Sequence, residues 1–274
     1  MRPPKATGTP VDAQRYGEWL ELFGQYRTHI TEDRLRTWLA QFAASDRDVA
    51  ARLLDSVDFY RSDRIDEALR AALGVLPGWS RDEGQRQGRW RFAAMSQSAG
   101  ESGDSMLHWF RIANQLTQKQ FNSLFITPSR ILQQQLGPDD TLVLLDDFVG
   151  TGDQVCKAWE AGFSELTAGV GRLYLLVVAA CQDGKQRVQS STSLRVLNAD
   201  ELTSSDNVFS DACTHFDAAE KSRILYYCRR AGPAKPKGHG NCGLVVVFAH
   251  RCPNNSLPAL HAIRRNYWRP IFPR

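Results

Sequence analysis

TLVLLDDFVGTGDQ, residues 141–154, is the stretch of sequence that decides the fold. Four apolar residues, Leu142 to Leu145, lead into two carboxylates, a glycine-rich turn and then apolar residues at helical spacing. An uninterrupted apolar run bounded by turn residues is typical of a buried strand in a parallel sheet. The stretch therefore predicts a strand–turn–helix unit of an α/β fold. Asp146 and Asp147 are expected at the carboxyl end of the strand, where open α/β sheets bind ligands.

The turn after the acid pair has the composition of an anion site. Gly150, Thr151 and Gly152 lead towards a predicted helix, and glycines let a ligand approach backbone N–H groups closely. An acid pair beside a phosphate cradle suits a ligand that carries both a diol and a phosphate, such as a ribose 5-phosphate. The alternative is a generic strand–turn–helix with a solvated acidic corner, because acid pairs often follow apolar strands in α/β proteins.

The same stretch resembles the phosphoribosyl-pyrophosphate (PRPP) signature of type I phosphoribosyltransferases, which is a hydrophobic strand, two acidic residues, two hydrophobic residues and a small-Thr-Gly turn. The resemblance implies a Rossmann-like α/β fold with a mainly parallel sheet flanked by helices. It also implies that Asp146 and Asp147 are catalytic and hold the ribose 2′- and 3′-hydroxyls. The implied ribose-phosphate-binding residues are Asp146, Asp147, Phe148, Val149, Gly150, Thr151, Gly152, Asp153 and Gln154.

Three positions depart from that signature. Phe148 stands where an aliphatic residue is usual, Gly150 where Thr, Ser, Ala or Asp is usual, and Gln154 where a small hydroxyl residue is usual. The Asp that handles a purine base in some relatives is absent at position 150, which argues against an ordinary purine salvage enzyme. The change at Gln154 favours a protein that binds a ribose phosphate without efficient transfer.

A second loop of Ser and Gly precedes this stretch. Residues 91–95 are predicted as a strand, and residues 96–103 separate it from a helix that carries Met106 and Phe110. In the resemblance this loop takes the place of the pyrophosphate loop, and its implied contacts are Ser98, Gly100, Ser102 and Gly103. Alone, a Ser/Gly turn is a weak signal, and its order relative to the acid-pair strand strengthens it.

The next segments concern the lid and the base. Residues 121–126 are predicted as a strand, and Ile131, Leu132 and Leu136 predict a packed helix within the short connection 127–140. Type I enzymes usually carry a long mobile loop there, which closes over the substrates and excludes water. Either another segment acts as the lid, or efficient transfer chemistry is absent.

Polar residues also follow the last predicted strand of the sheet, residues 244–248. We expect them to face the same end of the sheet as Asp146, so that His250, Asn254 and Asn255 are candidate lid or base contacts. A purely structural role is equally open, because Asn side chains make turns by bonding to their own backbone.

The composition is that of a globular protein. The chain has 274 residues, a formal charge of +4 and six cysteines without a CxxC pair, which we interpret as reduced thiols of a cytoplasmic protein rather than a zinc site. No apolar run approaches the roughly 18 residues that a membrane helix needs. Residues 264–274 are basic and aromatic, but one short patch does not indicate a nucleic-acid partner. The predicted parts are a disordered leader (1–10), a helical region (11–77), a linker (78–89) and an α/β domain (90–274).

Motifs outside the acid pair narrow the resemblance. The loop DDFVGTG, the earlier loop around residues 100–103, the helical segments WLAQF and LLDSVDFY and the terminal PNNSLP together resemble PRTase-CE, the phosphoribosyltransferase-like domain of bacterial conflict systems. That family implies an antiphage or related role and a protein partner from the same locus. One hypothesis is then an enzyme that uses PRPP with Mg²⁺. The other is an inactive nucleotide-sensing module that acts through the partner.

Overall fold

The computed structural model describes residue 5, residues 11–96 and residues 102–274. Apart from Lys5, the predicted leader 1–10 lies outside the described residues. The chain divides into two compact units. We call residues 63–202 the sheet unit, and residues 1–62 with 203–274 the bipartite unit. These boundaries differ from the predicted ones, because the N-terminal helices share a unit with the C-terminal part of the chain.

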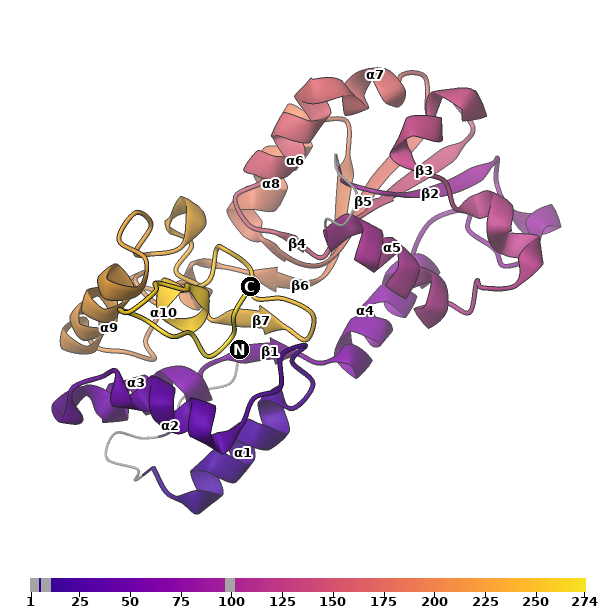
Figure 1. The fold of residues 1–274 in the computed structure, drawn as a ribbon. Helices are drawn as coiled ribbons and strands as arrows, with labels where there is room; N and C mark the ends of the chain where they lie inside the picture. The colour runs from indigo at the N-terminus through magenta and orange to yellow at the C-terminus, as the bar shows by residue number, and fades with distance from the viewer. Residues whose placement is uncertain (1–4, 6–10, 97–101) are drawn as a thin grey trace. The chain divides into compact units, whose positions relative to one another are not determined.

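The sheet unit contains five helices and five strands among its described residues (Figure 1). The helices are α4 (Ser62–Gly74), α5 (Ser102–Ala113), α6 (Asp153–Ala158), α7 (Ser164–Leu166) and α8 (Gln182–Ser191). The strands are β2 (Trp90–Ala94), β3 (Thr141–Leu145), β4 (Phe148–Val149), β5 (Arg172–Cys181) and β6 (Arg195–Leu202).

All strand pairs in this sheet are parallel. β3 lies between β2 and β5, and β6 pairs with the other edge of β5. β4 continues β3 along β5 without a change of register, since Leu145 pairs with Leu176 and Phe148 pairs with Ala179. The predicted α/β fold with a mainly parallel sheet is therefore confirmed.

The prediction of a strand over residues 121–126 is wrong. Residues Lys119–Leu124 form a 3₁₀ helix, in which Phe121 and Leu124 are buried. Their three-residue spacing matches the period of that helix, which satisfies backbone groups locally. The end of the segment reaches the sheet through a single parallel bridge between Phe125 and Phe92 on the outer edge of β2, and Ile126 N donates to Phe92 O at 3.0 Å.

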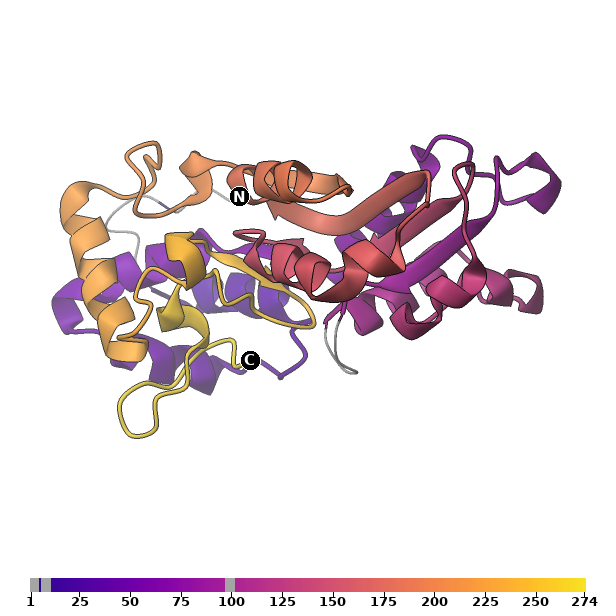
Figure 2. The same cartoon turned by 90° about the horizontal axis from the view of Figure 1, so that it is seen from above.

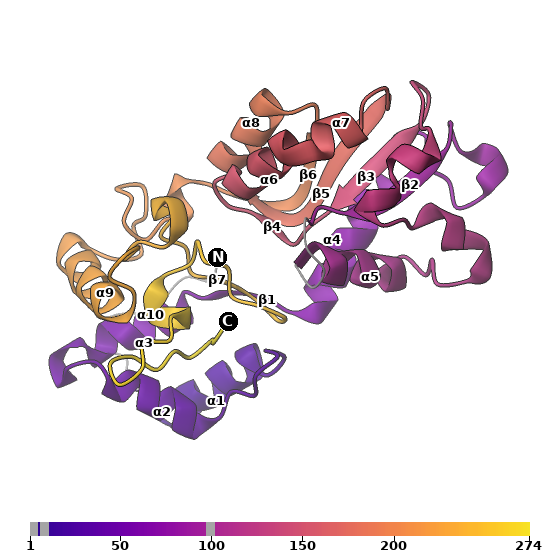
Figure 3. The same cartoon turned by 45° about the horizontal axis from the view of Figure 1, so that its top comes forward.

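Helices cover both faces of the sheet (Figure 3). Val155 of α6 and Val188 of α8 belong to the hydrophobic cluster that covers Leu142 and Leu144 on one face. On the other face α5 packs on β2, where the rings of Phe92 and Phe110 lie 5.0 Å apart. Coverage of both faces explains why the apolar run before the acid pair is uninterrupted, since every residue of it is buried.

The bipartite unit combines both ends of the chain (Figure 2). Its helices are α1 (Ala13–Phe23), α2 (Glu32–Ala40), α3 (Arg47–Asp55), α9 (Ala218–Ala231) and α10 (Pro258–His261). Its strands, β1 (Asp58–Tyr60) and β7 (Val246–Phe248), form a separate two-stranded parallel sheet. The helical pattern predicted for residues 11–77 therefore missed β1. Long-range pairing with β7 holds these three residues extended.

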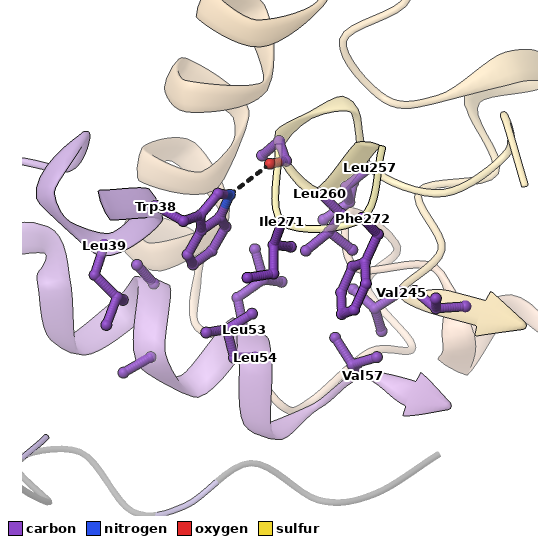
Figure 4. Close-up of a cluster of buried hydrophobic side chains, with 14 of the residues drawn as sticks. Trp38, Leu39, Leu53, Leu54, Val57, Val245, Leu257, Leu260, Ile271 and Phe272 are labelled. Atoms are coloured by element: carbon purple, nitrogen blue, oxygen red, sulfur yellow. Dashed lines mark hydrogen bonds between the residues drawn. The ribbon is translucent and has the colours of Figure 1, made fainter. Parts of the chain in front are cut away.

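The core of the bipartite unit is aromatic and joins residues that are far apart in sequence (Figure 4). Leu53 and Leu54 of α3 and Trp38 of α2 lie in one cluster with Ile271 and Phe272. The indole Nε1 of Trp38 donates a hydrogen bond to the carbonyl oxygen of Ala259 at 2.8 Å. The N-terminal helices thus form one core with the C-terminal segment and are not a separate helical domain.

The helices and the cysteines can be compared with what the composition predicted. None of the helices in the described part of the chain has the length and apolarity that a membrane crossing requires. None of the six cysteines, all of which lie in the described part of the chain, forms a disulfide, and four of them are buried, namely Cys156, Cys213, Cys228 and Cys252.

Candidate functional site at the carboxyl edge of the sheet

The acid pair lies where β3 passes into β4. The backbone of both residues stays bonded to β5, since Asp146 N donates to Leu176 O at 3.1 Å and Val178 N donates to Asp147 O at 3.1 Å. Asp147 N also donates to Asp146 Oδ1 at 2.9 Å. Asp146 is 4% exposed and Asp147 is 8% exposed. The two residues between β3 and β4 thus stay hydrogen-bonded to β5 through their backbone.

The strand order places this pair at a topological switch point. Phe125 continues the sheet beyond one edge of β2, whereas β3 follows on the other edge of β2. The chain thus changes direction between β2 and β3, and open α/β sheets bind ligands outside the carboxyl ends of such strands. The last β2 pair is Ala94 with Leu145, directly before Asp146. The acid pair therefore begins where β2 ends.

The start of α5 lies against the same point. A Cβ atom on Gly103 would lie 3.0 Å from Leu145 O and 3.1 Å from Met95 N, so a side chain here would push against the neighbouring backbone. Ser96 Oγ, just after β2, bonds to Asp104 Oδ1 at 3.2 Å. The structure thus brings Gly103 next to Leu145, the residue before the acid pair, and its role as a pyrophosphate contact stays a prediction. Of the other predicted pyrophosphate contacts, Ser98 and Gly100 lie outside the described residues, and Ser102 is the first residue of α5.

The loop of residues 150–152 packs tightly on α8. A Cβ on Gly184 would lie 1.9 Å from Gly150 O, and a Cβ on Gly152 would lie 2.8 Å from Gly184 O. Gly152 also has φ +76°, a left-handed conformation that favours glycine. Packing and backbone conformation thus require glycine at position 152, and the close approach of Gly150 O requires it at position 184.

Side chains at the end of this loop are also tied down. Asp153 N donates to Thr151 Oγ1 at 3.3 Å, and the Asp153 carboxylate forms an ion pair with Arg187 of α8. Gln154 is exposed. The Arg187–Asp153 pair connects α8 to the first residue of α6 and places a guanidinium beside the predicted phosphate loop.

Gly184 is a residue of this site that the sequence analysis missed. It lies inside the polar helix α8, where glycine costs about 1 kcal/mol relative to alanine. An interior helix glycine is the signal that something approaches its backbone closely. The sequence alone does not reveal that the approaching segment is the loop after the acid pair.

Replacing Gly184 by Ala is expected to lower the free energy of unfolding by about 1–3 kcal/mol, because the new Cβ overlaps Gly150 O and forces the loop to move. Gly74→Ala is the matched control, since nothing lies within 4 Å of a Cβ there and the residue ends a helix. Urea denaturation of both variants measures the difference. Equal stability of the two would show that the loop does not rest on α8 as described.

The connection 127–140 is compact. It forms two 3₁₀ turns, Pro128–Arg130 and Leu132–Gln134, instead of the predicted packed helix. Ile131 and Leu136 are buried as expected, but Leu132 is 59% exposed. The prediction was wrong because two short 3₁₀ turns replace the helix. In this arrangement Ile131 and Leu136 are buried, whereas Leu132 lies at the surface.

Asp140 fastens the end of this connection. Its carboxylate accepts hydrogen bonds from Arg89 N at 2.6 Å and Gly137 N at 2.8 Å and forms an ion pair with the Arg89 guanidinium. Burial tends to raise the pKa of Asp140, but these bonds outweigh it and hold the pKa below its ordinary value. Arg89 Nη1 also donates to Gln134 O at 3.0 Å. The connection is therefore a packed crossover and not a long lid.

His250, Asn254 and Asn255 do not follow a strand of this sheet. The strand before them, β7, pairs with β1 in the bipartite unit, so the expectation that they share a sheet edge with Asp146 is wrong. In sequence, an apolar run followed by polar residues looks the same whichever sheet the strand joins. Only the strand pairing shows that β7 belongs to the two-stranded sheet. Asn255 is 6% exposed, and its Nδ2 donates to His239 O at 3.2 Å. A role of the three residues as lid or base contacts stays a prediction.

Comparison with known proteins gives the family. No curated protein matches the chain. Among solved structures, the orotate phosphoribosyltransferase from Aeropyrum pernix is similar with 16% sequence identity and a TM-score of 0.26, over 52% of this chain and 69% of that chain, a likeness too weak to bear on the site. The model of the PRTase-CE family, the one suggested by the motifs, matches residues 35–274 and so includes the acid pair and both compact units. The chain belongs to the PRTase-CE family.

Proposed function

We propose that the protein binds PRPP, or a nucleotide that carries a ribose phosphate, at the carboxyl edge of the sheet unit. The observation that carries the proposal is the meeting of three features at one switch point: the acid pair, the loop of residues 150–152 and the start of α5. Carboxylates accept hydrogen bonds from a diol, and backbone N–H groups donate to phosphate oxygens. A site that offers both carboxylates and backbone N–H groups suits a ligand that carries both a diol and a phosphate.

In this proposal the acid pair binds the sugar. Asp146 and Asp147 accept hydrogen bonds from the ribose 2′- and 3′-hydroxyls, and the loop of residues 150–154 binds the 5′-phosphate. A ribose diol supplies a hydroxyl donor for each of the two carboxylates.

Mg²⁺ fits this donor set. It prefers oxygen ligands, keeps several waters and binds through one or two carboxylates together with ligand phosphates. Among the described residues no group of three or more His, Cys, Asp or Glu side chains could hold a metal ion, so the ligand itself would supply most of the coordination. Bound Mg²⁺ supplies charge neutralisation of the pyrophosphate, and Asp146 and Asp147 are the residues that would hold it near the ribose.

If the protein is an enzyme, it is a phosphoribosyltransferase. An acceptor nucleophile forms a bond to C1 of the ribose, the bond between C1 and the pyrophosphate oxygen breaks, and pyrophosphate leaves with the electron pair. The protein contributes by positioning the sugar and by stabilising the departing charge. Both contributions depend on the rigid placement of the acid pair between β3 and β4.

A specific observation favours the second candidate, a nucleotide-sensing module without transfer activity. The connection 127–140, where active type I enzymes carry a long mobile loop, is short and fastened to Arg89 through Asp140. Without a closing loop, water reaches the reactive sugar, and efficient transfer is lost. A module of this kind would act in the cytoplasm on a protein partner from the same bacterial conflict or antiphage locus.

One experiment separates the two candidates. The full chain is titrated calorimetrically with PRPP and Mg²⁺, and pyrophosphate release is followed in the same sample. Binding with release supports the transferase, and binding without release supports the sensor. Absence of binding would overturn the proposal that this edge of the sheet recognises ribose phosphates.

A further inference from the structure

A second candidate ligand site lies within the bipartite unit, apart from the acid pair. It is a cavity of about 770 Å³ between the start of α2 and the C-terminal segment 263–273. This volume falls within the range of roughly 300–1,000 Å³ that small-molecule sites occupy. All of its lining residues belong to the bipartite unit, so the cavity does not depend on the sheet unit.

The lining of the cavity is strongly cationic. It includes four arginines, Arg34, Arg264, Arg265 and Arg269, against one carboxylate, Asp33. The guanidinium groups of Arg265 and Arg269 are exposed and have no hydrogen-bond or ion-pair partner within the part of the chain that the structure describes. This excess of positive charge belongs to one concave site in a chain whose total formal charge is only +4.

Arg34 is half-buried at the start of α2. Its Nη2 donates to Pro270 O at 3.2 Å, but its Nε is buried without a hydrogen-bond partner among the described residues. Burial lowers the pKa of Arg34, with a smaller opposing effect from Tyr26. A buried donor on a charged group is costly when it is unpaired, and an anion that accepts from it would recover that cost.

The walls that carry the arginines are rigid. The indole Nε1 atoms of Trp38 and Trp268 both donate to Ala259 O, at 2.8 and 2.9 Å. Gln41 holds the backbone of Arg269 from both sides, accepting from its N at 2.7 Å and donating to its carbonyl oxygen at 2.8 Å. Backbone positions fixed before binding reduce the entropy that a ligand must overcome.

We propose that this cavity binds a phosphate-bearing small molecule. Guanidinium groups form paired, charge-assisted hydrogen bonds with phosphate oxygens, and three arginines of one short segment line this cavity together with a fourth from α2. A concave site of this size suits a compact anion better than an extended nucleic-acid strand, which would need a basic surface that continues along its backbone. The inference is independent of the proposed function of the acid pair.

The test uses inorganic pyrophosphate, titrated calorimetrically into the full chain without Mg²⁺ and at constant salt. Arg265→Ala with Arg269→Ala should weaken binding at least about tenfold, since each charged hydrogen bond contributes on the order of 1.5–3 kcal/mol. Arg47→Ala with Arg229→Ala removes the same charge from exposed positions outside the cavity and should change the affinity less than about twofold.

Two additions keep the result interpretable. Repeating the titrations on the Asp146→Asn, Asp147→Asn variant should leave the effect of the Arg265 and Arg269 substitutions in place, because that effect belongs to another unit. Lack of pyrophosphate binding at millimolar concentration, or equal affinity of the two double-arginine variants, would overturn the proposal. So would a single-stranded RNA that displaces pyrophosphate and binds more tightly, since it would assign the arginines to nucleic acid.

Discussion

Replacing Asp146 and Asp147 together by Asn should weaken the binding of PRPP with Mg²⁺ by about 100-fold or more and leave the fold intact. Each carboxylate is expected to accept a charge-assisted hydrogen bond worth roughly 1.5–3 kcal/mol, so the loss of both is large. Asparagine keeps the side-chain volume, and the backbone bonds of both residues to β5 do not involve the carboxylates. Calorimetric titration measures the affinity, and circular dichroism measures the fold.

The matched control removes the same charge elsewhere in the sheet unit. Glu160→Gln with Glu165→Gln changes two exposed carboxylates in the segment after α6 and should leave the affinity within about twofold. If the Asp146, Asp147 variant binds as tightly as the unmodified chain, the acid pair does not contact the ligand. If both double variants lose affinity equally, the effect is one of net charge and not of a specific site.

Replacing Asp55 by Ala should lower the unfolding free energy of the bipartite unit by about 3–5 kcal/mol, because it leaves a buried arginine without its partner. Arg15 is 1% exposed and Asp55 is 0% exposed, and Arg15 Nη2 lies 2.6 Å from Asp55 Oδ2. Trp19 Nε1 donates to the same carboxylate at 2.9 Å. Urea denaturation followed by far-UV circular dichroism measures the loss.

Two variants test the reason for that loss. Arg47→Ala lies on the same helix α3 but is exposed, and should change the unfolding free energy by no more than about 0.5 kcal/mol. Arg15→Met with Asp55→Leu removes both charges and should restore most of the stability that the single change removes. A loss below about 1 kcal/mol for Asp55→Ala would mean that the ion pair does not hold α1 against α3.

The amino-acid sequence by itself determined the local unit around the acid pair. Residues 142–145 predict a strand buried on both faces because each of them is apolar, and each is buried in the structure. The glycines of residues 150–152 predict a turn, and Gly152 has φ +76° there. Burial and backbone conformation constrain residue types over only a few consecutive positions, so the local sequence is enough to predict them. The parallel α/β fold and the acid pair with its glycine-rich loop followed from this one stretch.

Tertiary structure alone decided how distant segments combine. The apolar run before His250 looks like another strand of the main sheet, but it pairs with Asp58–Tyr60 in the bipartite unit. Gly184 supports the loop of residues 150–152 from a helix that follows it by some thirty positions. The arginine cavity needs Arg34 beside Arg265 and Arg269. Such contacts depend on packing between surfaces that are remote in sequence, and residue spacing along the chain carries no record of which surfaces meet.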